Sequence, residues 1–356
     1  MTSVQRVATP QELDQGAVQL DVMKKIIRDN PIRLTIAFFC ILLFIGLTLW
    51  KSYAPLSVHE RNKTEISKIR PAKPDDITFA VFGDNKGNYS FFEPLLHDID
   101  HDKEIAFAMD IGDLVGDGKV SQYRRFLDQV QRNLTIPLLT ATGNHDFNNG
   151  FDQYKDIFGA TYYAFRVGPY SFIVLDATDD SGFDRTERQW LKGELEKAQD
   201  AKARFVFMHI PPFDPRGDGT YLPERDRNDL LELFRRYKVT HLFASHIHGY
   251  FSGLWEGIPY TITGGGGARL QGKDPEHFFY HYVKAHVSDG KVDFTVRRIE
   301  AENMIARYYD LLSYFPVEGG LFLCFGLSLL TLRSMRRRLA RPDKKAEPTA
   351  HHEGAR

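Results

Sequence analysis

The sequence has 356 residues, enough for one large domain or two ordinary ones with buried cores. Its 47 acidic and 46 basic residues nearly cancel, so the formal charge of −1 gives no reason to expect a nucleic acid as partner. The two cysteines, Cys40 and Cys324, lie in apolar runs near the two ends, which excludes a disulfide framework or a thiolate metal site in the polar middle.

The chain opens with a polar segment, residues 1–33, that we expect to be cytoplasmic. Residues 34–50 (LTIAFFCILLFIGLTLW) follow without a charge, and about 17 apolar residues are the lower limit for crossing a bilayer. A buried core helix would normally carry a polar stripe, and Pro55 disfavours cleavage after the small residues Ser52 and Ala54. An uncleaved transmembrane helix is therefore predicted, followed by a proline-containing linker over residues 51–75.

Residues 76–300 alternate short apolar runs with amphipathic segments, which is typical of an α/β domain. Buried strands are predicted at 77–82, 105–110, 136–141, 171–176, 204–209 and 240–245, and helices at 119–133, 186–199 and 227–237. Asp289 and Gly290 are expected at the turn of a hairpin that closes the domain.

A connector at 301–313 leads to a second apolar segment, 314–332, with Glu318 near its start. Because a charge near a helix end can reach the membrane interface, we predict a second transmembrane helix, with an interfacial or re-entrant helix as the alternative. Residues 333–356 form a basic tail that we expect to be disordered. Basic residues at the outer ends of both apolar segments place the domain outside the cytoplasm, on the periplasmic face of the inner membrane if the organism is bacterial.

Polar motifs follow five of the predicted strands, at the edge where α/β sheets bind ligands. The motifs are Gly83-Asp84-Asn85-Lys86, Gly112-Asp113, Gly143-Asn144-His145-Asp146, His209, and His246-Ile247-His248. Each alone is more often a turn or a structural histidine. Together, converging carboxylates, an amide and imidazoles would repel or stay unpaired without a cation, so the set predicts a metal centre.

This ordered set resembles that of the calcineurin-like metallophosphoesterases over about residues 77–265. The resemblance implies an α/β fold of two mixed β-sheets packed face to face with helices outside, and a site for two divalent ions (Mn, Fe or Zn). Asp113 would bridge the two ions. One ion would also be held by Asn144, His209 and His246, and the other by Asp84 and His248. His145 would lie beside the scissile phosphate, with Asp146 orienting its ring.

Two divalent ions about 3.5–4 Å apart can clamp a phosphate and turn a bridging water into an attacking hydroxide. A histidine held by a carboxylate can then assist the leaving alkoxide. We therefore predict a membrane-anchored hydrolase of phosphate monoesters or diesters, whose place beside a bilayer favours a lipid-linked or envelope-derived substrate. No nucleic acid is expected, and no protein partner can be inferred. The alternative is a metal-binding but inactive scaffold or receptor domain at the membrane.

Lys86 departs from the family pattern, in which many members have Asp-x-His in the first motif. An ammonium has no lone pair for a metal, so the ion at Asp84 and His248 lacks one protein ligand. That ion could bind weakly, take extra water or use Asp117. Lys86 itself could bind a substrate phosphate beside Asn85, or point to solvent. Arg216, between the two histidine motifs, is a further candidate for substrate binding, with a solvated loop as the alternative.

Overall fold

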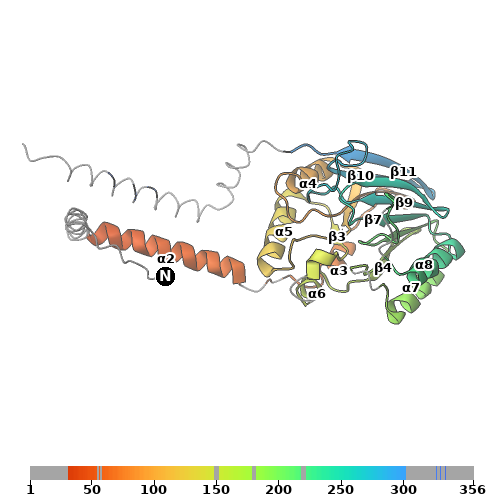
Figure 1. Cartoon of the computed structure of the whole chain (residues 1–356), viewed down its shortest axis with the longest axis horizontal. Coiled ribbons are helices and arrows are strands. Elements are labelled where there is room, and N and C mark those ends of the chain that lie inside the picture. The colour runs from red at the N-terminus through yellow and green to blue at the C-terminus, as the bar shows by residue number, and fades with distance from the viewer. Residues whose placement is uncertain are drawn as a thin grey trace, which may run out of the picture. The chain divides into compact units, whose positions relative to one another are not determined.

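The computed structural model describes residues 31–53, 56, 58–147, 152–178, 182–217 and 222–301, together with Gly326, Leu329 and Arg333. The chain divides into two units, one of residues 52–304 and one made of the terminal segments 1–51 and 305–356. The unit of residues 52–304 contains two β-sheets and the helices that cover them (Figure 1).

One sheet has five strands in the order β11-β10-β1-β2-β3. Its parallel part is β1 (Asp76–Phe82), β2 (Ile105–Asp110) and β3 (Leu138–Thr140), and the antiparallel hairpin of β10 (His281–Ser288) and β11 (Lys291–Arg298) extends it beyond β1. Alternate residues of a strand face opposite ways. Ala80 and Phe82 of β1 therefore pack outward against α4 (Phe92–His101) and α5 (Val120–Asn133), in a cluster that also includes side chains of α6 (Asp152–Phe158).

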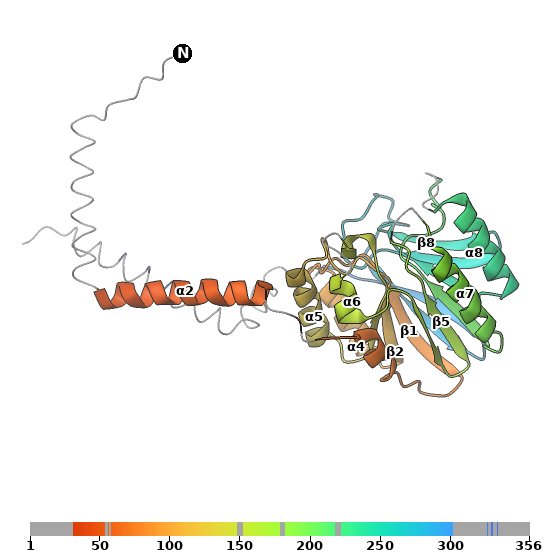
Figure 2. The ribbon, with the colours of Figure 1, turned by 90° about the horizontal axis from the view of Figure 1, so that it is seen from below.

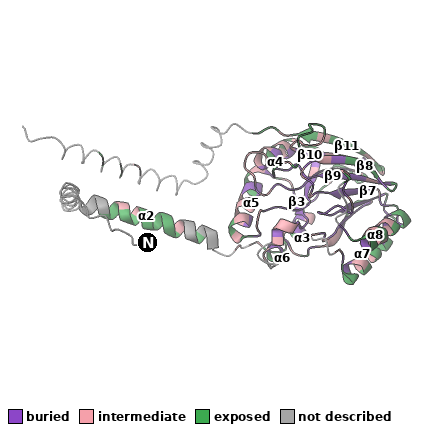
Figure 3. Cartoon of the chain, viewed as in Figure 1, coloured by how far each residue is buried: buried purple, intermediate pink, exposed green. Residues whose placement is uncertain are grey.

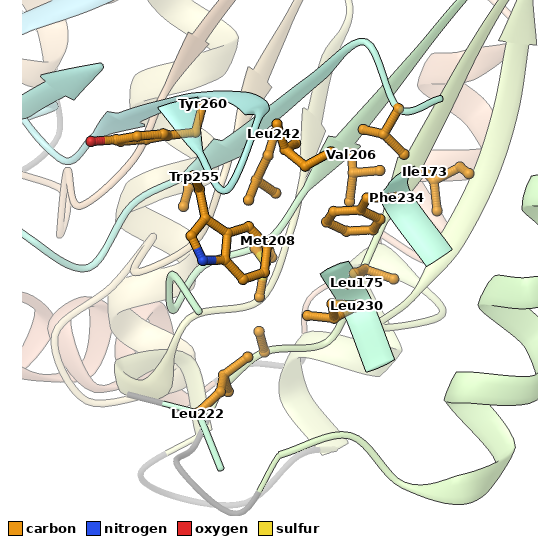
Figure 4. Close-up of a cluster of buried hydrophobic side chains, with 14 of the residues drawn as sticks. Ile173, Leu175, Val206, Met208, Leu222, Leu230, Phe234, Leu242, Trp255 and Tyr260 are labelled. Carbon is orange, nitrogen blue, oxygen red and sulfur yellow. The ribbon is translucent and has the colours of Figure 1, made fainter. Parts of the chain in front are cut away.

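The second sheet has six strands in the order β4-β5-β6-β7-β9-β8. These are β4 (Tyr163–Val167), β5 (Tyr170–Val174), β6 (Ala203–Phe207), β7 (His241–Ala244), β9 (Ile258–Thr263) and β8 (Tyr250–Trp255). Helices α7 (Arg185–Lys197) and α8 (Glu224–Arg236) lie along the outer side of this sheet (Figure 2). Leu230 and Phe234 of α8 point toward Ile173 and Val206 of the sheet (Figure 4), so the helix buries its apolar face there.

The main core lies between the two sheets, where the strands are buried (Figure 3). The Phe79 ring of the first sheet is 5.3 Å from Phe107 beside it and 5.3 Å from Phe205 of the second sheet, measured between centroids. Burying each such side chain contributes about 1.5–3 kcal/mol. Strands covered on both faces have continuous apolar sequences, which is why these strands could be predicted. The predicted pair of mixed sheets with helices outside is confirmed.

All six predicted strands and all three predicted helices are present, with ends that differ by no more than three residues. The predicted hairpin turn at Asp289 and Gly290 is also present, between β10 and β11. The sequence interpretation did not include β4, β8, α4 or α6. Two of these, β4 and β8, are edge strands of the second sheet with exposed positions, so they lack a continuous apolar run.

The segment predicted as a linker, 51–75, contains a helix of the domain, α3 (Arg61–Ile66). Its buried Asn62 pairs with the backbone of Thr140 in the edge strand β3. The Asn62 Nδ2 donates to the Thr140 carbonyl (3.1 Å), and the Thr140 N–H donates to Asn62 Oδ1 (2.9 Å). The amide thus satisfies backbone groups that an edge strand would leave unpaired. This part of the predicted linker is structural.

Helix α2 (Pro31–Tyr53) belongs to the other unit up to Lys51 and contains the predicted spanning segment 34–50. Apart from three residues, the second predicted segment and the tail, 314–356, lie outside the described residues, as do residues 1–30. In the part of the chain for which a structure is described, there is no helix of both the length and the apolarity needed to cross a membrane. The transmembrane segments stay predictions.

Candidate metal centre

The five predicted motifs meet at one edge of the sandwich, because β1, β2 and β3 of one sheet and β6 and β7 of the other deliver them there. Four motif residues have a left-handed backbone: Asp84 (φ 58°), Lys86 (φ 47°), Asp113 (φ 59°) and His246 (φ 67°). Each such residue costs about 1–3 kcal/mol and persists only where its surroundings over-determine it. Here the Asp84 N–H donates to the Gly112 carbonyl (2.9 Å), which ties the first two motifs together.

Gly143 allows the third motif to lie against the second. A Cβ at this position would collide with the backbone nitrogen and Oδ1 of Asp113. The absence of a side chain therefore brings Asn144 and His145 within reach of Asp113. The His145 N–H donates to Asp113 Oδ1 (2.9 Å).

The first half of the site comprises Asp113, Asn144, His209 and His246. Asn144 Oδ1 lies 3.1 Å from both His209 Nε2 and His246 Nδ1. Asp113 Oδ1 lies 3.4 Å from His209 Nε2, and both side chains are buried. Burial lowers the pKa of His246 to about 4, so its imidazole is neutral at physiological pH. Four ligand atoms from four chain segments thus converge.

The hydrogen bonds around His209 indicate that this half fits a cation. Its Nδ1 is 3.0 Å from the Ile111 carbonyl oxygen, which can only accept, so Nδ1 carries a proton, and a neutral ring then presents a lone pair on Nε2. That lone pair faces Asn144 Oδ1 and Asp113 Oδ1, which are also acceptors. Buried acceptors that face one another need a positive charge among them. Imidazole, amide and carboxylate donors suit Mn, Fe or Zn.

The second half comprises Asp84 and His248, with Asp113 shared. Asp84 Oδ2 accepts hydrogen bonds from Ser245 Oγ and from the His246 N–H (2.8 Å), while Oδ1 accepts none and lies 3.2 Å from His248 Nε2. Burial acts to raise the pKa of Asp84, but the hydrogen bond and the charge of His248 hold that pKa below its usual range, so the carboxylate is charged. Ligand atoms of Asp84, Asp113 and His248 lie within 4.8 Å of one another. These three residues could hold a second ion.

Lys86 points into this second half and not to solvent. Its Nζ lies 3.2 Å from Asp113 Oδ2, and its side chain is 22% exposed. Asp113 therefore presents one carboxylate oxygen to each half: Oδ1 faces His209, and Oδ2 faces the ammonium. The second half contains a positive charge supplied by the chain itself.

The structure corrects the predicted role of Asp146. Its buried carboxylate accepts from the backbone N–H groups of Asp113 (3.0 Å), Val115 (3.2 Å) and Gly143 (2.8 Å), and it makes no hydrogen bond to the His145 ring. Burial, and then the nearby Asp113 charge, raise the pKa of Asp146 well above its usual range. Because its lone pairs are taken by the two turns, Asp146 positions the second and third motifs. Its role is in the turns and not on the His145 ring.

The His145 ring is oriented instead by a backbone carbonyl. Its Nδ1 donates to the Gly116 carbonyl oxygen (2.8 Å), so Nε2 is the nitrogen that faces the site. Nε2 lies 4.0 Å from Asp113 Oδ2, and the side chain is 36% exposed. The ring is thus held at one nitrogen and accessible at the other.

Three further predicted residues have other partners. Asn85 is buried, and its side chain bridges Asp110 Oδ2 (2.7 Å) and the Gly87 N–H (2.8 Å), so it shapes the turn and does not face a substrate. The Arg216 guanidinium donates to both carboxylate oxygens of Asp214 and also to Gln271 Oε1 (3.2 Å). The Asp117 carboxylate accepts from Lys119 Nζ (3.1 Å), so it is not brought to Asp84.

Other groups at the site were not singled out from the sequence. Ser245 donates to Asp84, and its only sequence signal is its place directly before the His-x-His motif. The carbonyls of Ile111, Gly116 and Arg269 each accept from the Nδ1 of a site histidine; the Arg269 carbonyl is 2.6 Å from His248 Nδ1. Such partners fix a ring's tautomer and direction. Backbone carbonyls leave no side-chain signal in a sequence.

Residues 77–250 match the family model of the calcineurin-like phosphoesterases. The serine/threonine-protein phosphatase CPPED1 of Rattus norvegicus is 27% identical over 193 residues, which cover 49% of this chain and 56% of that protein. The "Probable cyclic nucleotide phosphodiesterase" of Rhodopseudomonas palustris is 28% identical over 175 residues, which cover 46% of this chain and 64% of that protein. The chain therefore spans less than two thirds of each of these relatives.

Among solved structures, the purple acid phosphatase PPD1 from yellow lupin (Lupinus luteus) seeds superposes with a TM-score of 0.51. The sequence identity is 19%, and the match covers 65% of this chain and 54% of that one, so the likeness concerns the fold. Family model, relatives and fold agree. The chain carries a calcineurin-like metallophosphoesterase domain, a domain of the class that hydrolyses phosphoric esters.

Proposed function

We propose that the protein is a metal-dependent phosphoesterase, with its active site at the metal centre described above. The observation that carries the proposal is the cluster of facing acceptors formed by Asp113, Asn144 and His209. In the family, divalent ions at such a site supply an activated water and positive charge for the phosphoryl oxygens. The residues that would hold an ion are Asp113, Asn144, His209 and His246, and Asp84 and His248 line the other side of the site.

His145 is the residue that we assign to the leaving group. Its Nδ1–H is held by the Gly116 carbonyl, so the ring presents Nε2 to the site at a fixed angle. A proton on Nε2 can pass to the departing ester oxygen, which would otherwise leave as an unstable alkoxide. His145 is not among the proposed ligands, so metal binding and leaving-group assistance reside in separate side chains.

The proposal is tested by activity and metal content measured together. Full-length protein should hydrolyse a p-nitrophenyl phosphate mono- or diester, and the preferred ester identifies the substrate class. It should contain Mn, Fe or Zn, and exhaustive chelation should abolish hydrolysis until metal is restored. Full activity in metal-free protein would refute the proposal. Stoichiometric metal without hydrolysis of either ester would favour the inactive scaffold.

We further propose that α2 holds the domain at a membrane, with the active site outside the cytoplasm. The support is the apolar sequence of this helix and its exposed side chains, such as Phe38 (58%), Phe39 (63%) and Trp50 (70%). A lipid-linked or envelope-derived phosphate ester would then be within reach.

Reporter fusions test this location. A reporter that works only outside the cytoplasm should be active when fused after Lys68 and inactive when fused after Pro342. The reverse pattern would place the site in the cytoplasm. Activity at both positions would mean that residues 314–332 do not span, and recovery of the whole chain in the soluble fraction would argue against any anchor.

A further inference from the structure

Both the backbone and the side chain of Lys86 contact Asp113. Its backbone N–H donates to the Asp113 carbonyl oxygen (3.0 Å), and its Nζ lies 3.2 Å from Asp113 Oδ2. The turn that aims it is fixed by Asn85, whose side chain is anchored on Asp110 and on the Gly87 N–H. The ammonium therefore points inward as a consequence of the local fold.

The ammonium lies where a second divalent ion would need its shared ligand. Asp84, Asp113 and His248 could hold such an ion, but the Asp113 oxygen on that side already contacts Nζ. An ion bound through the same carboxylate would sit close to the ammonium, and like charges at that separation repel strongly in a partly buried site. A lysine also offers no lone pair in exchange. The first half of the site has no such competitor among the contacts described.

We propose that Lys86 takes the place of the second divalent ion. The site would bind one ion, at Asp113, Asn144, His209 and His246, and the ammonium would supply the other positive charge beside Asp84. The Lys86 side chain is 22% exposed, so a phosphate oxygen could approach its ammonium. This inference rests on the proposed function, because it describes how the same site neutralises its ester substrate.

Metal stoichiometry tests the proposal. Full-length protein is titrated with Mn²⁺, the bound metal is counted per chain, and electron paramagnetic resonance distinguishes an isolated Mn²⁺ from a spin-coupled pair. The wild type should bind one uncoupled Mn²⁺. Lys86→His should bind two as a coupled pair, because an imidazole adds the missing lone pair and histidine tolerates a left-handed backbone. Lys103→His, at a lysine that is 78% exposed, is the matched control and should bind one.

Lys86→Met separates charge from ligation, because it removes the ammonium without adding a donor. It should bind a second Mn²⁺ about 10–100-fold more tightly than the wild type does. A coupled pair in the wild type would overturn the inference, as would a folded Lys86→His that still binds one ion, or a Lys86→Met that binds the second Mn²⁺ no more tightly than the wild type.

Hydrolysis of p-nitrophenyl phosphate and of bis(p-nitrophenyl) phosphate, both measured on the same samples, separates this inference from the proposed function. One Mn²⁺ without activity would refute the hydrolase alone. Two coupled Mn²⁺ with activity would refute the role of Lys86 alone. A protein that binds neither Mn²⁺ nor Fe nor Zn would refute both.

Discussion

The two halves of the site share Asp113 but neutralise it in different ways. On one side, Asp113 Oδ1 faces His209 Nε2, which also faces the Asn144 amide oxygen, so that metal-ligating atoms of three side chains meet there. On the other side, Asp113 Oδ2 faces the Lys86 ammonium, which already provides a charge. One half therefore needs a cation from solution, and the other contains one. A site assembled from matching motifs can thus depart from the pattern of its family through one side chain.

The largest expected effect comes from removing a ligand of the half that needs an ion. Asn144→Ala deletes the oxygen that lies 3.1 Å from two imidazoles, so the protein should lose its metal. Activity should fall at least about 10⁴-fold, because the several kcal/mol of charge stabilisation that a metal provides is lost with it. Metal content and hydrolysis rate are the measurements. Asn133→Ala, at the end of α5, is the control, and an Asn144→Ala protein with normal metal would contradict the assignment.

His145 should show a loss that depends on the substrate. His145→Ala should retain its metal but slow an alkyl phosphate ester about 10²–10⁴-fold, because an alkoxide needs a proton to leave. A nitrophenyl ester should be slowed much less, since its leaving group needs little protonation. The ratio of the two rates in mutant and wild type is the readout. An equal loss for both esters would mean that His145 positions the substrate.

His248→Ala probes the half that carries its own charge. Because this ring faces Asp84 beside Lys86, its removal should leave the metal of the other half in place. We expect a loss of activity of no more than about 10–100-fold, the range seen when a residue supports a metal site without supplying its main ligands. If His248→Ala loses metal and activity as completely as Asn144→Ala, the two halves are equivalent and the comparison fails.

Asp146→Asn should act mainly on stability. The carboxylate accepts from three backbone N–H groups, and an amide would place a second donor against at least one of them. Leaving a buried donor unpaired costs about 1–3 kcal/mol of unfolding free energy. Denaturant unfolding measures this loss. The alkyl-to-nitrophenyl rate ratio should stay as in the wild type, and a shift of that ratio toward the His145→Ala value would restore the original assignment of Asp146 to the His145 ring.

Much of the fold followed from the sequence because buried strands have continuous apolar runs. The strand at 105–110 was predicted to the residue, and the motifs were placed at strand ends, where the structure has them. The edge strands β4 and β8 of the second sheet and helix α3 were not predicted. Edge strands expose one side, and the importance of Asn62 depends on Thr140, which is 78 residues away. Patterns within a short window carry no information about such a pair.

The residue types of the site and their order along the chain could be recognised without a structure, because metal ligation needs lone pairs that few side chains offer. The partner of each polar atom, in contrast, depends on the three-dimensional arrangement of the turns. Asp146 and His145 are adjacent in the chain, yet the turn geometry directs the carboxylate to backbone amides and the ring to the Gly116 carbonyl. The sequence also left the contact of the Lys86 ammonium open. In the structure, the left-handed turn after β1 places this ammonium beside Asp113. Hydrogen-bond direction depends on three-dimensional placement, and sequence spacing does not encode it.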